Sequence, residues 1–489
     1  MRRLPLLGAL ALAALLAPGL VRAGGFMIYE HSALGTGMAD ARTALWDDPS
    51  SMFYNPSAIT ELDGFQLSLG DTLLIPGNTY TPTTEPPCVP DTSVDPPIPS
   101  PCRSATGDFH VFYPAHAYFT AEATTWLHVG IGYNNPFGLG SYWPADWDGK
   151  FTAYQTYIET HFIEPVLALD IAELAGMSDD CALSFAVGGY YVYGKAKLAS
   201  KLDATDTWNA YHDPADPPPV ADMAMEGDGH GGGFNFSVFA AYKKWISFGA
   251  SVRSNVTMDF SGTARFTAPT AAWADVMRGS GFLPASTPGT TSIELPWNMN
   301  FGMAFHGLPH FTFAVDAYVT LWQSYDQLQV HFDCERAPRT GPNWCDPGLN
   351  AQAVYPKKWN TGVQLSFGAE YRPIPDLAIR AGYGYVTDPT NPVYYDAQLP
   401  DGNRHLITFG IGYRAPELFK VDIGYMLALW SGTKDNTVGS TSPLFQNGQA
   451  NGTYDTMVHI LALTLGFSFD VNGMAPPPTL DAEPALPTP

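Results

Sequence analysis

Apolar residues alternate with small or polar residues through long stretches of this chain. The segment from Phe248 to Phe260 shows the pattern: almost every second residue is apolar, and Gly, Ser, Arg, Asn, Thr and Asp stand between them. A period of two predicts a β-strand with one apolar and one polar face. In a soluble sandwich such apolar faces meet in a shared core. In an outer-membrane barrel they face lipid, and the polar faces line the interior.

The alternation predicts fourteen strands, which are joined in turn by short turns and long loops. The predicted strands are Phe65–Ile75, Phe109–Ala123, Trp126–Asn134, Phe151–Ala172, Ala182–Leu198, Gly233–Tyr242, Trp245–Phe266, Ser292–Phe305, Phe311–Phe332, Lys358–Arg372, Leu377–Thr387, His405–Arg414, Phe419–Trp430 and Thr453–Phe469. Short periplasmic turns, long external loops and an even strand number are typical of bacterial outer-membrane barrels. A sandwich offers no reason for this asymmetry between connections. We therefore predict an all-β fold, a 14-stranded antiparallel transmembrane β-barrel over residues 63–469.

Three segments lie outside the predicted barrel. Residues 1–23 carry Arg2 and Arg3, an apolar run and the small-residue site Val21-Arg22-Ala23, which predicts a secretory signal peptide. Residues 24–62 are rich in small residues and turn formers and lack strand alternation. Residues 470–489 form a Pro- and Ala-rich tail without core-forming content, which predicts disorder. The protein is expected to be exported.

Charge and cysteine content narrow the function classes. The formal net charge is −23, and nucleic-acid binding needs a basic footprint instead. Aromatic residues make up 13% of the chain, which suits the aromatic girdles of a membrane barrel. Cys88 and Cys102 bracket one predicted loop, and Cys334 and Cys345 bracket another, so two loop disulfides are the expectation in an oxidising compartment. No CxxC motif or close His spacing indicates a metal site, and no cofactor is expected.

A series of short motifs is spread in order over about 400 residues. These motifs are Gly25-Phe26, Ala33-Leu34-Gly35-Thr36-Gly37, Asp47-Asp48-Pro49, Phe53-Tyr54-Asn55-Pro56, Asn135-Pro136-Phe137-Gly138-Leu139, Trp147-Asp148-Gly149-Lys150, Arg253-Ser254-Asn255-Val256, Phe260-Ser261-Gly262, Trp359-Asn360-Thr361, Gly368-Ala369-Glu370-Tyr371-Arg372 and Arg380-Ala381-Gly382-Tyr383. Together they resemble the FadL/TodX family of outer-membrane transporters for long-chain fatty acids and other hydrophobic compounds. The family's Asn-Pro-Ala motif stands here as Asn55 and Pro56 followed by Ser57. The resemblance implies that residues 24–62 form a hatch, or plug, inside the barrel.

The resemblance also implies a transport route. Substrate would land between external loops, enter a lumen pocket that touches the plug near Phe26, and leave sideways into the bilayer through a kink in the third strand. Here that strand is interrupted at Asn134, Asn135, Pro136, Phe137 and Gly138. Pro136 has no N–H for the ladder, and Gly138 permits strained dihedrals, so strand pairing is expected to fail there. An ordinary loop start is the alternative interpretation.

Alternation sorts some charged residues into the lumen. With Val252, Val256 and Phe260 facing lipid, Arg253 and Asp259 are expected to face inward. The same alternation predicts that five more charged side chains face inward: Asp316, Glu370, Arg372, Arg380 and Asp422. Most of these charges are expected to pair with one another or with the plug, while Arg253 or Arg380 could hold a carboxylate head group bidentately.

One external loop contains a short helical pattern that exposes apolar side chains. The pattern predicts either ordinary loop packing or a capture surface for hydrophobic molecules, formed by Trp273, Val276, Met277, Phe282 and Leu283.

The sequence thus predicts passive, non-enzymatic uptake of hydrophobic compounds at the Gram-negative outer membrane by a monomeric barrel. The expected partners are long-chain fatty acids, aromatics or alkanes, the surrounding lipid and lipopolysaccharide, and the barrel-assembly machinery. Barrels of the family typically end on an aromatic residue that this machinery reads; here Phe469 closes the last predicted strand, but twenty residues follow it. A barrel lipid hydrolase is one alternative, although no GxSxG elbow is present. An open porin for polar solutes is another, and the apolar run Phe26-Met27-Ile28 suits a plug better than a water-filled pore.

Overall fold

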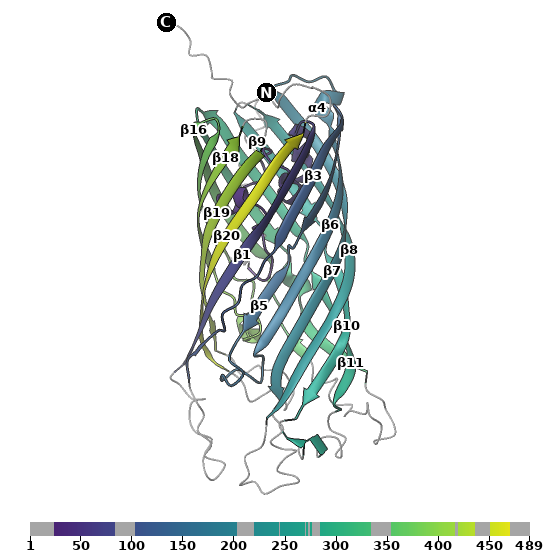
Figure 1. Cartoon of the computed structure of the whole chain (residues 1–489), viewed down its shortest axis with the longest axis vertical. Helices are drawn as coiled ribbons and strands as arrows, with labels where there is room; N and C mark the ends of the chain where they lie inside the picture. The colour runs from purple at the N-terminus through teal and green to yellow at the C-terminus, as the bar shows by residue number, and fades with distance from the viewer. Residues whose placement is uncertain are drawn as a thin grey trace.

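The computed structural model describes residues 24–83, 103–202, 220–243, 245–268, 270–271, 274–275, 284–333, 354–415, 419–435 and 450–469. In these ranges the chain forms one closed antiparallel β-barrel with steeply tilted strands (Figure 1). The strands are β1 (Phe65–Pro82), β2 (Ala105–Thr106), β3 (Ala115–Thr124), β4 (Leu127–Asn134), β5 (Gly138–Tyr142), β6 (Gln155–Asp170), β7 (Cys181–Leu202), β8 (Ala221–Tyr242), β9 (Ile246–Arg253), β10 (Val256–Thr267), β11 (Ser286–Leu295), β12 (Asn298–Leu308), β13 (Phe311–Thr320), β14 (Gln327–Phe332), β15 (Val354–Pro356), β16 (Gly362–Ile374), β17 (Leu377–Val386), β18 (Arg404–Ala415), β19 (Phe419–Lys434) and β20 (Gly452–Phe469).

The described elements form a wall of fourteen strands, because four of these strands are interrupted and consist of two elements each. The pairs β4/β5, β9/β10, β11/β12 and β13/β14 each form one strand of the wall, while β2 and β15 are short additions. The barrel closes where β1 pairs with β20, from Phe65 opposite Phe469 to Pro82 opposite Gly452 (Figure 1). This confirms the predicted 14-stranded antiparallel barrel.

The two faces of the wall differ as the alternation predicts. Along β20, Met457, Leu461 and Leu463 are exposed on the outer face, whereas Thr456 and Thr464 are buried inside. Strands in a lipid-facing wall show this dyad pattern because the outer side chains meet hydrocarbon. No helix in the described part of the chain has the length and apolar character needed to cross a membrane.

Several strands run further than predicted. β1 continues to Pro82, β7 to Leu202, and β8 begins at Ala221 although residues 226–233 are almost entirely Gly, Asp, Glu and His. These strand ends lie beyond the apolar outer band, where neither face needs apolar side chains. Hydrophobic alternation therefore ends before the hydrogen-bonded ladder does. In contrast, β3 begins at Ala115 rather than at Phe109.

The predicted orientation of the Val256–Phe260 segment is wrong. Val256 and Phe260 are buried inside the barrel, and Asp259 is exposed on its outer face. The reason is a one-residue register change: Arg253 of β9 lies opposite Asn235 of β8, but Asp259 of β10 lies opposite His230. An extra residue at the Ser254–Asn255 break turns every following side chain to the other face. Arg253, before the break, faces inward as predicted.

The segment after Gly24 folds inside the barrel as three short turns, α2 (Ala33–Thr36), α3 (Ser51–Tyr54) and the 3₁₀-helix η1 (Pro56–Glu61) (Figure 1). Ser32 caps α2 by accepting a hydrogen bond from the Gly35 N–H, and the Asn55 side chain caps η1. Nearly every residue from 31 to 60 is buried. We call residues 24–62 the plug.

Candidate functional site: a cavity at the broken third strand

The third strand of the barrel wall is interrupted between β4 and β5. Both pieces pair with β6, but Asn134 lies opposite Phe162 and Gly138 lies opposite Glu159. Regular pairing is therefore lost at residues 135–137, where only the Thr160 N–H still donates to the Phe137 carbonyl, at 3.2 Å. Side chains replace the lost bonds: the Asn135 amide donates to the Thr160 carbonyl at 2.7 Å, and the Thr160 hydroxyl donates to the Phe137 carbonyl at 2.7 Å. The break is therefore a stabilised feature of the wall.

The plug pairs directly with this break. Met27 and Phe137 form an isolated antiparallel β-bridge, with the Ile28 N–H donating to the Pro136 carbonyl at 2.8 Å. The Gly138 N–H donates to the Phe26 carbonyl at 3.0 Å. A Cβ atom at Gly138 would lie 2.8 Å from the Ile28 side chain, so glycine permits this close approach.

The other edge of β5 has no regular neighbour in the described wall. The segment of residues 107–114 lies between β1 and β5, where Phe112 forms an isolated bridge with Leu74 and Asp108 donates to the Tyr142 carbonyl. The Phe112 ring occupies the place that a side chain at Gly140 would need. This part of the wall is closed by a loosely paired segment instead of a continuous ladder.

A cavity of about 590 Å³ lies at this place. It is lined by residues 25–30 of the plug, by the break and β5, by residues 109–114, and by the inner faces of β16 to β20. Phe109 and Tyr113 in that lining are 79% and 62% exposed, so the cavity is bordered in part by exposed aromatic side chains. Its volume lies in the usual range for small-molecule sites.

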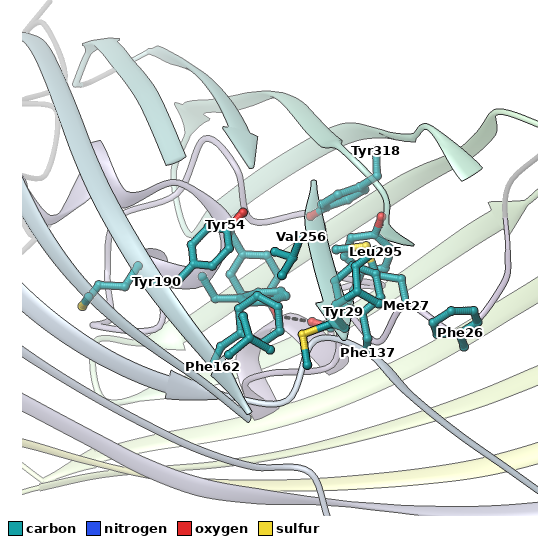
Figure 2. Packing of buried hydrophobic residues seen from close by; sticks show 14 of the residues in the cluster. Phe26, Met27, Tyr29, Tyr54, Phe137, Phe162, Tyr190, Val256, Leu295 and Tyr318 are labelled. Carbon is teal, nitrogen blue, oxygen red and sulfur yellow. Dashed lines mark hydrogen bonds between the residues drawn. The ribbon is translucent and has the colours of Figure 1, made fainter. Parts of the chain in front are cut away.

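Phe26 lies at the centre of an aromatic cluster beside the cavity. Its ring is 4.6 Å from Trp322, 5.7 Å from Tyr325 and 6.0 Å from Trp359, measured between ring centroids, and it is 4% exposed. Figure 2 shows the wider cluster, in which plug side chains pack against the barrel wall; it labels Phe26, Met27, Tyr29 and Tyr54 from the plug and Phe137, Phe162, Tyr190, Val256, Leu295 and Tyr318 from the wall.

The start of the plug is held by polar groups far away in the sequence. Asp401 accepts a hydrogen bond from the Gly25 N–H at 2.5 Å, and Arg404 donates to the Gly25 carbonyl at 2.6 Å. Trp322 donates to the Gly24 carbonyl at 2.9 Å. Burial raises the pKa of Asp401, against the opposing effect of Arg404. Sequence reasoning missed Trp322, Asp401 and Arg404, because no local pattern links them to the plug.

Arg253 and Arg380 do not line the cavity. Arg253 lies 3.3 Å from the Glu164 carboxylate and over the Phe53 ring. Arg380 donates to Glu370 at 2.7 Å and to Asp422 at 2.6 Å. This second network joins the plug through Asp47, to which Arg42, Arg372 and Lys420 are paired. Both arginines therefore already have carboxylate partners within the protein.

The Asn55-Pro56 motif fixes the plug to the wall. The Asn55 amide donates to the carbonyls of Thr43 at 2.9 Å and Val238 at 3.1 Å, and its oxygen accepts from the Ser57 hydroxyl. Pro56 occupies the first turn of η1, where a missing N–H costs nothing.

The remaining predicted site residues lie outside the described residues. They are the loop surface of Trp273, Val276, Met277, Phe282 and Leu283 and the disulfide candidates Cys88, Cys102, Cys334 and Cys345. Cys181 is a free thiol. Within the described ranges, no cluster of His, Cys, Asp and Glu side chains could hold a metal ion.

Known proteins resemble this chain over nearly its whole length. Residues 14–469 match the family described as "Outer membrane protein transport protein (OMPP1/FadL/TodX)". Outer membrane protein P1 of Haemophilus influenzae is 23% identical over 494 residues, covering 94% of this chain and 98% of that protein. The long-chain fatty acid transport protein of Escherichia coli O6:H1 is 20% identical over 435 residues, covering 85% and 89%.

Solved structures share the fold. The crystal structure of a Pseudomonas aeruginosa FadL homologue aligns with a TM-score of 0.74 at 16% identity, covering 91% of this chain and all of that one. The Pseudomonas putida toluene transporter TodX aligns with a TM-score of 0.62 at 13% identity, covering 92% and 100%.

Proposed function

This chain belongs to the outer membrane protein transport protein family (OMPP1/FadL/TodX), and from that premise we propose that it passes hydrophobic molecules sideways into the bilayer through its broken third strand. It is an outer-membrane transporter of hydrophobic compounds and not an enzyme, as the sequence predicts. The lateral route and the roles of individual residues are the proposal.

One observation carries the lateral route. The same cavity touches Phe26 of the plug and the exposed side chains of Phe109 and Tyr113. Residues 109–114 form one side of that cavity and belong to a segment that pairs with the wall at isolated points. Exit there places the molecule directly in hydrocarbon, so it never has to cross water.

The lateral gate is formed by Asn134, Asn135, Pro136, Phe137 and Gly138 together with residues 107–114. Phe26 contributes to the pocket, and Asn55 and Pro56 hold the plug. We further propose that Trp273, Val276, Met277, Phe282 and Leu283 form the external capture surface, next to lipopolysaccharide. Relatives named for long-chain fatty acids and for toluene support a hydrophobic cargo.

The test restores an unbroken third strand with Pro136→Val plus Gly138→Val. Uptake of uncharged oleyl alcohol is measured in cells that lack their own transporter of this family. We expect it to fall to background while the folded barrel is retained. Pro165→Val plus Gly189→Val is the matched control, because both residues lie on the outer face of continuous strands. Full uptake by the straightened variant would reject lateral exit.

A further inference from the structure

The cavity beside the plug contains an excess of negative charge. Its lining includes three carboxylates, Glu30, Glu159 and Asp401, but one guanidinium, Arg404. Arg404 and Asp401 form an ion pair at 2.9 Å, and Arg404 also bonds Gly25 and lies over the Trp430 ring. The single cation of the lining is therefore already occupied.

The three carboxylates differ in their partners. Glu159 accepts a hydrogen bond from the Tyr157 hydroxyl and lies 3.4 Å from the His161 ring. Among the residues that the structure describes, Glu30 has no ion-pair partner within 4.0 Å, and the Tyr29 N–H donates to its carboxylate at 3.1 Å. Burial raises the pKa of Glu30, against the opposing effects of backbone hydrogen bonds and of the Arg404 charge.

Removal of the signal peptide after Ala23 does not change the charged partners of Glu30. It would create an ammonium group at Gly24, whose neighbour is Asp401, since a Cβ atom at Gly24 would lie 2.5 Å from the Asp401 carboxylate. That charge adds to the compensation of Asp401. Among the three carboxylates of the lining, Glu30 remains the one without an ion-pair partner within 4.0 Å in the described residues.

Building on the proposed uptake function, we propose that this cavity selects uncharged hydrophobic molecules with a hydroxyl end, that Glu30 accepts the hydroxyl hydrogen bond, and that carboxylate-bearing molecules are rejected. A hydroxyl donor gives Glu30 a charge-assisted hydrogen bond, which is stronger than a neutral one. A second carboxylate in the same cavity would meet like-charge repulsion that the low dielectric strengthens. The apolar tail would lie against Leu406, Val458 and Ile460.

The test measures binding of 1-decanol, decanoate and decane to the purified mature protein in detergent at pH 8 by titration calorimetry. We expect decanol to bind at least about tenfold more tightly than decanoate. In Glu30→Gln, whose amide can both donate and accept, we expect the two affinities to come within about threefold of each other. Glu226→Gln is the control, because Glu226 is exposed on β8 and lies outside the cavity.

The outcomes separate this inference from the function on which it rests. Decanoate binding as tightly as decanol in the wild-type protein would overturn the inference and leave hydrophobic uptake standing. Unchanged discrimination in Glu30→Gln would also overturn it, since Glu30 would then not be the selective group. Failure of all three compounds to bind would overturn the proposed function as well.

Discussion

Met27 of the plug and Phe137 of the third strand form a β-bridge, so the first residues of the plug act as a short extra strand against the break in the barrel wall. The two hydrogen bonds around this bridge join Ile28 to Pro136 and Gly138 to Phe26. The same backbone segment thus borders the lumen cavity and stabilises the break. Displacing the plug start would change the pocket and the gate together.

Removing one donor of this bridge tests the coupling. Ile28→Pro deletes the N–H that bonds the Pro136 carbonyl, at a cost of about 0.5–1.5 kcal/mol. We expect the Gly138 amide, which bonds Phe26 across the bridge, to exchange its hydrogen about 2- to 13-fold faster. Ile28→Ala keeps the N–H and is the control for side-chain loss. Equal exchange in wild type and Ile28→Pro would show that the bridge does not order the break.

The Phe26 ring is predicted to be a binding element. Phe26→Ala removes its contacts with Trp322, Tyr325 and Trp359, and aromatic pairs of this kind are worth about 0.5–1.5 kcal/mol each. We expect at least about tenfold weaker binding of 1-decanol by calorimetry, while the hydrogen-bonded barrel stays folded. Phe248→Ala, on the exposed outer face of β9, should bind like the wild type. Unaltered affinity in Phe26→Ala would exclude Phe26 from the pocket.

The barrel could be predicted because lipid imposes one rule on every strand. Alternation gave the strand number and the inward positions of Arg380 and Asp422, and Pro136 marked the break because it lacks a ladder N–H. Alternation failed where that rule does not act. The polar end of β8 extends beyond the apolar band, and one extra residue near Ser254 reversed the faces of β10.

Most of the cavity could not be predicted, since its walls meet only in three dimensions. Asp401 and Gly25 are 376 residues apart, and nothing near either residue in the sequence indicates the other. The same holds for Glu30, which looks like an ordinary acidic residue in the sequence until the barrel places it in one cavity lining with β5 and Arg404. Arg253 and Arg380 were reasonable head-group candidates, but partner carboxylates from neighbouring strands already bind them.

Asn55 is expected to hold the plug in place. Asn55→Ala leaves the buried carbonyls of Thr43 and Val238 without these donors, which costs about 1–3 kcal/mol. We expect faster proteolysis within residues 24–62 of the folded barrel, and Asn55→Asp should be at least as sensitive because it replaces the donor with an anionic acceptor. Asn391→Ala, which removes the cap of a 3₁₀-turn outside the plug, is the control. Plug proteolysis at the wild-type rate in Asn55→Ala would contradict an anchoring role.

The Arg380 network is expected to contribute to barrel stability. Arg380 is 1% exposed and bonds both Glu370 and Asp422, so Arg380→Met leaves two buried carboxylates without their main partner. Breaking a buried ion pair in this way costs about 3–5 kcal/mol. The measurement is the midpoint temperature at which the folded, compact band disappears on unboiled electrophoresis gels. Adding Glu370→Gln and Asp422→Asn to Arg380→Met should recover much of the loss, because the unpaired charges are then absent.

Lys358→Met breaks an exposed ion pair with Asp326 and should change the midpoint little, since exposed pairs contribute about 0–1 kcal/mol. Equal effects of Arg380→Met and Lys358→Met would refute the role of the buried network.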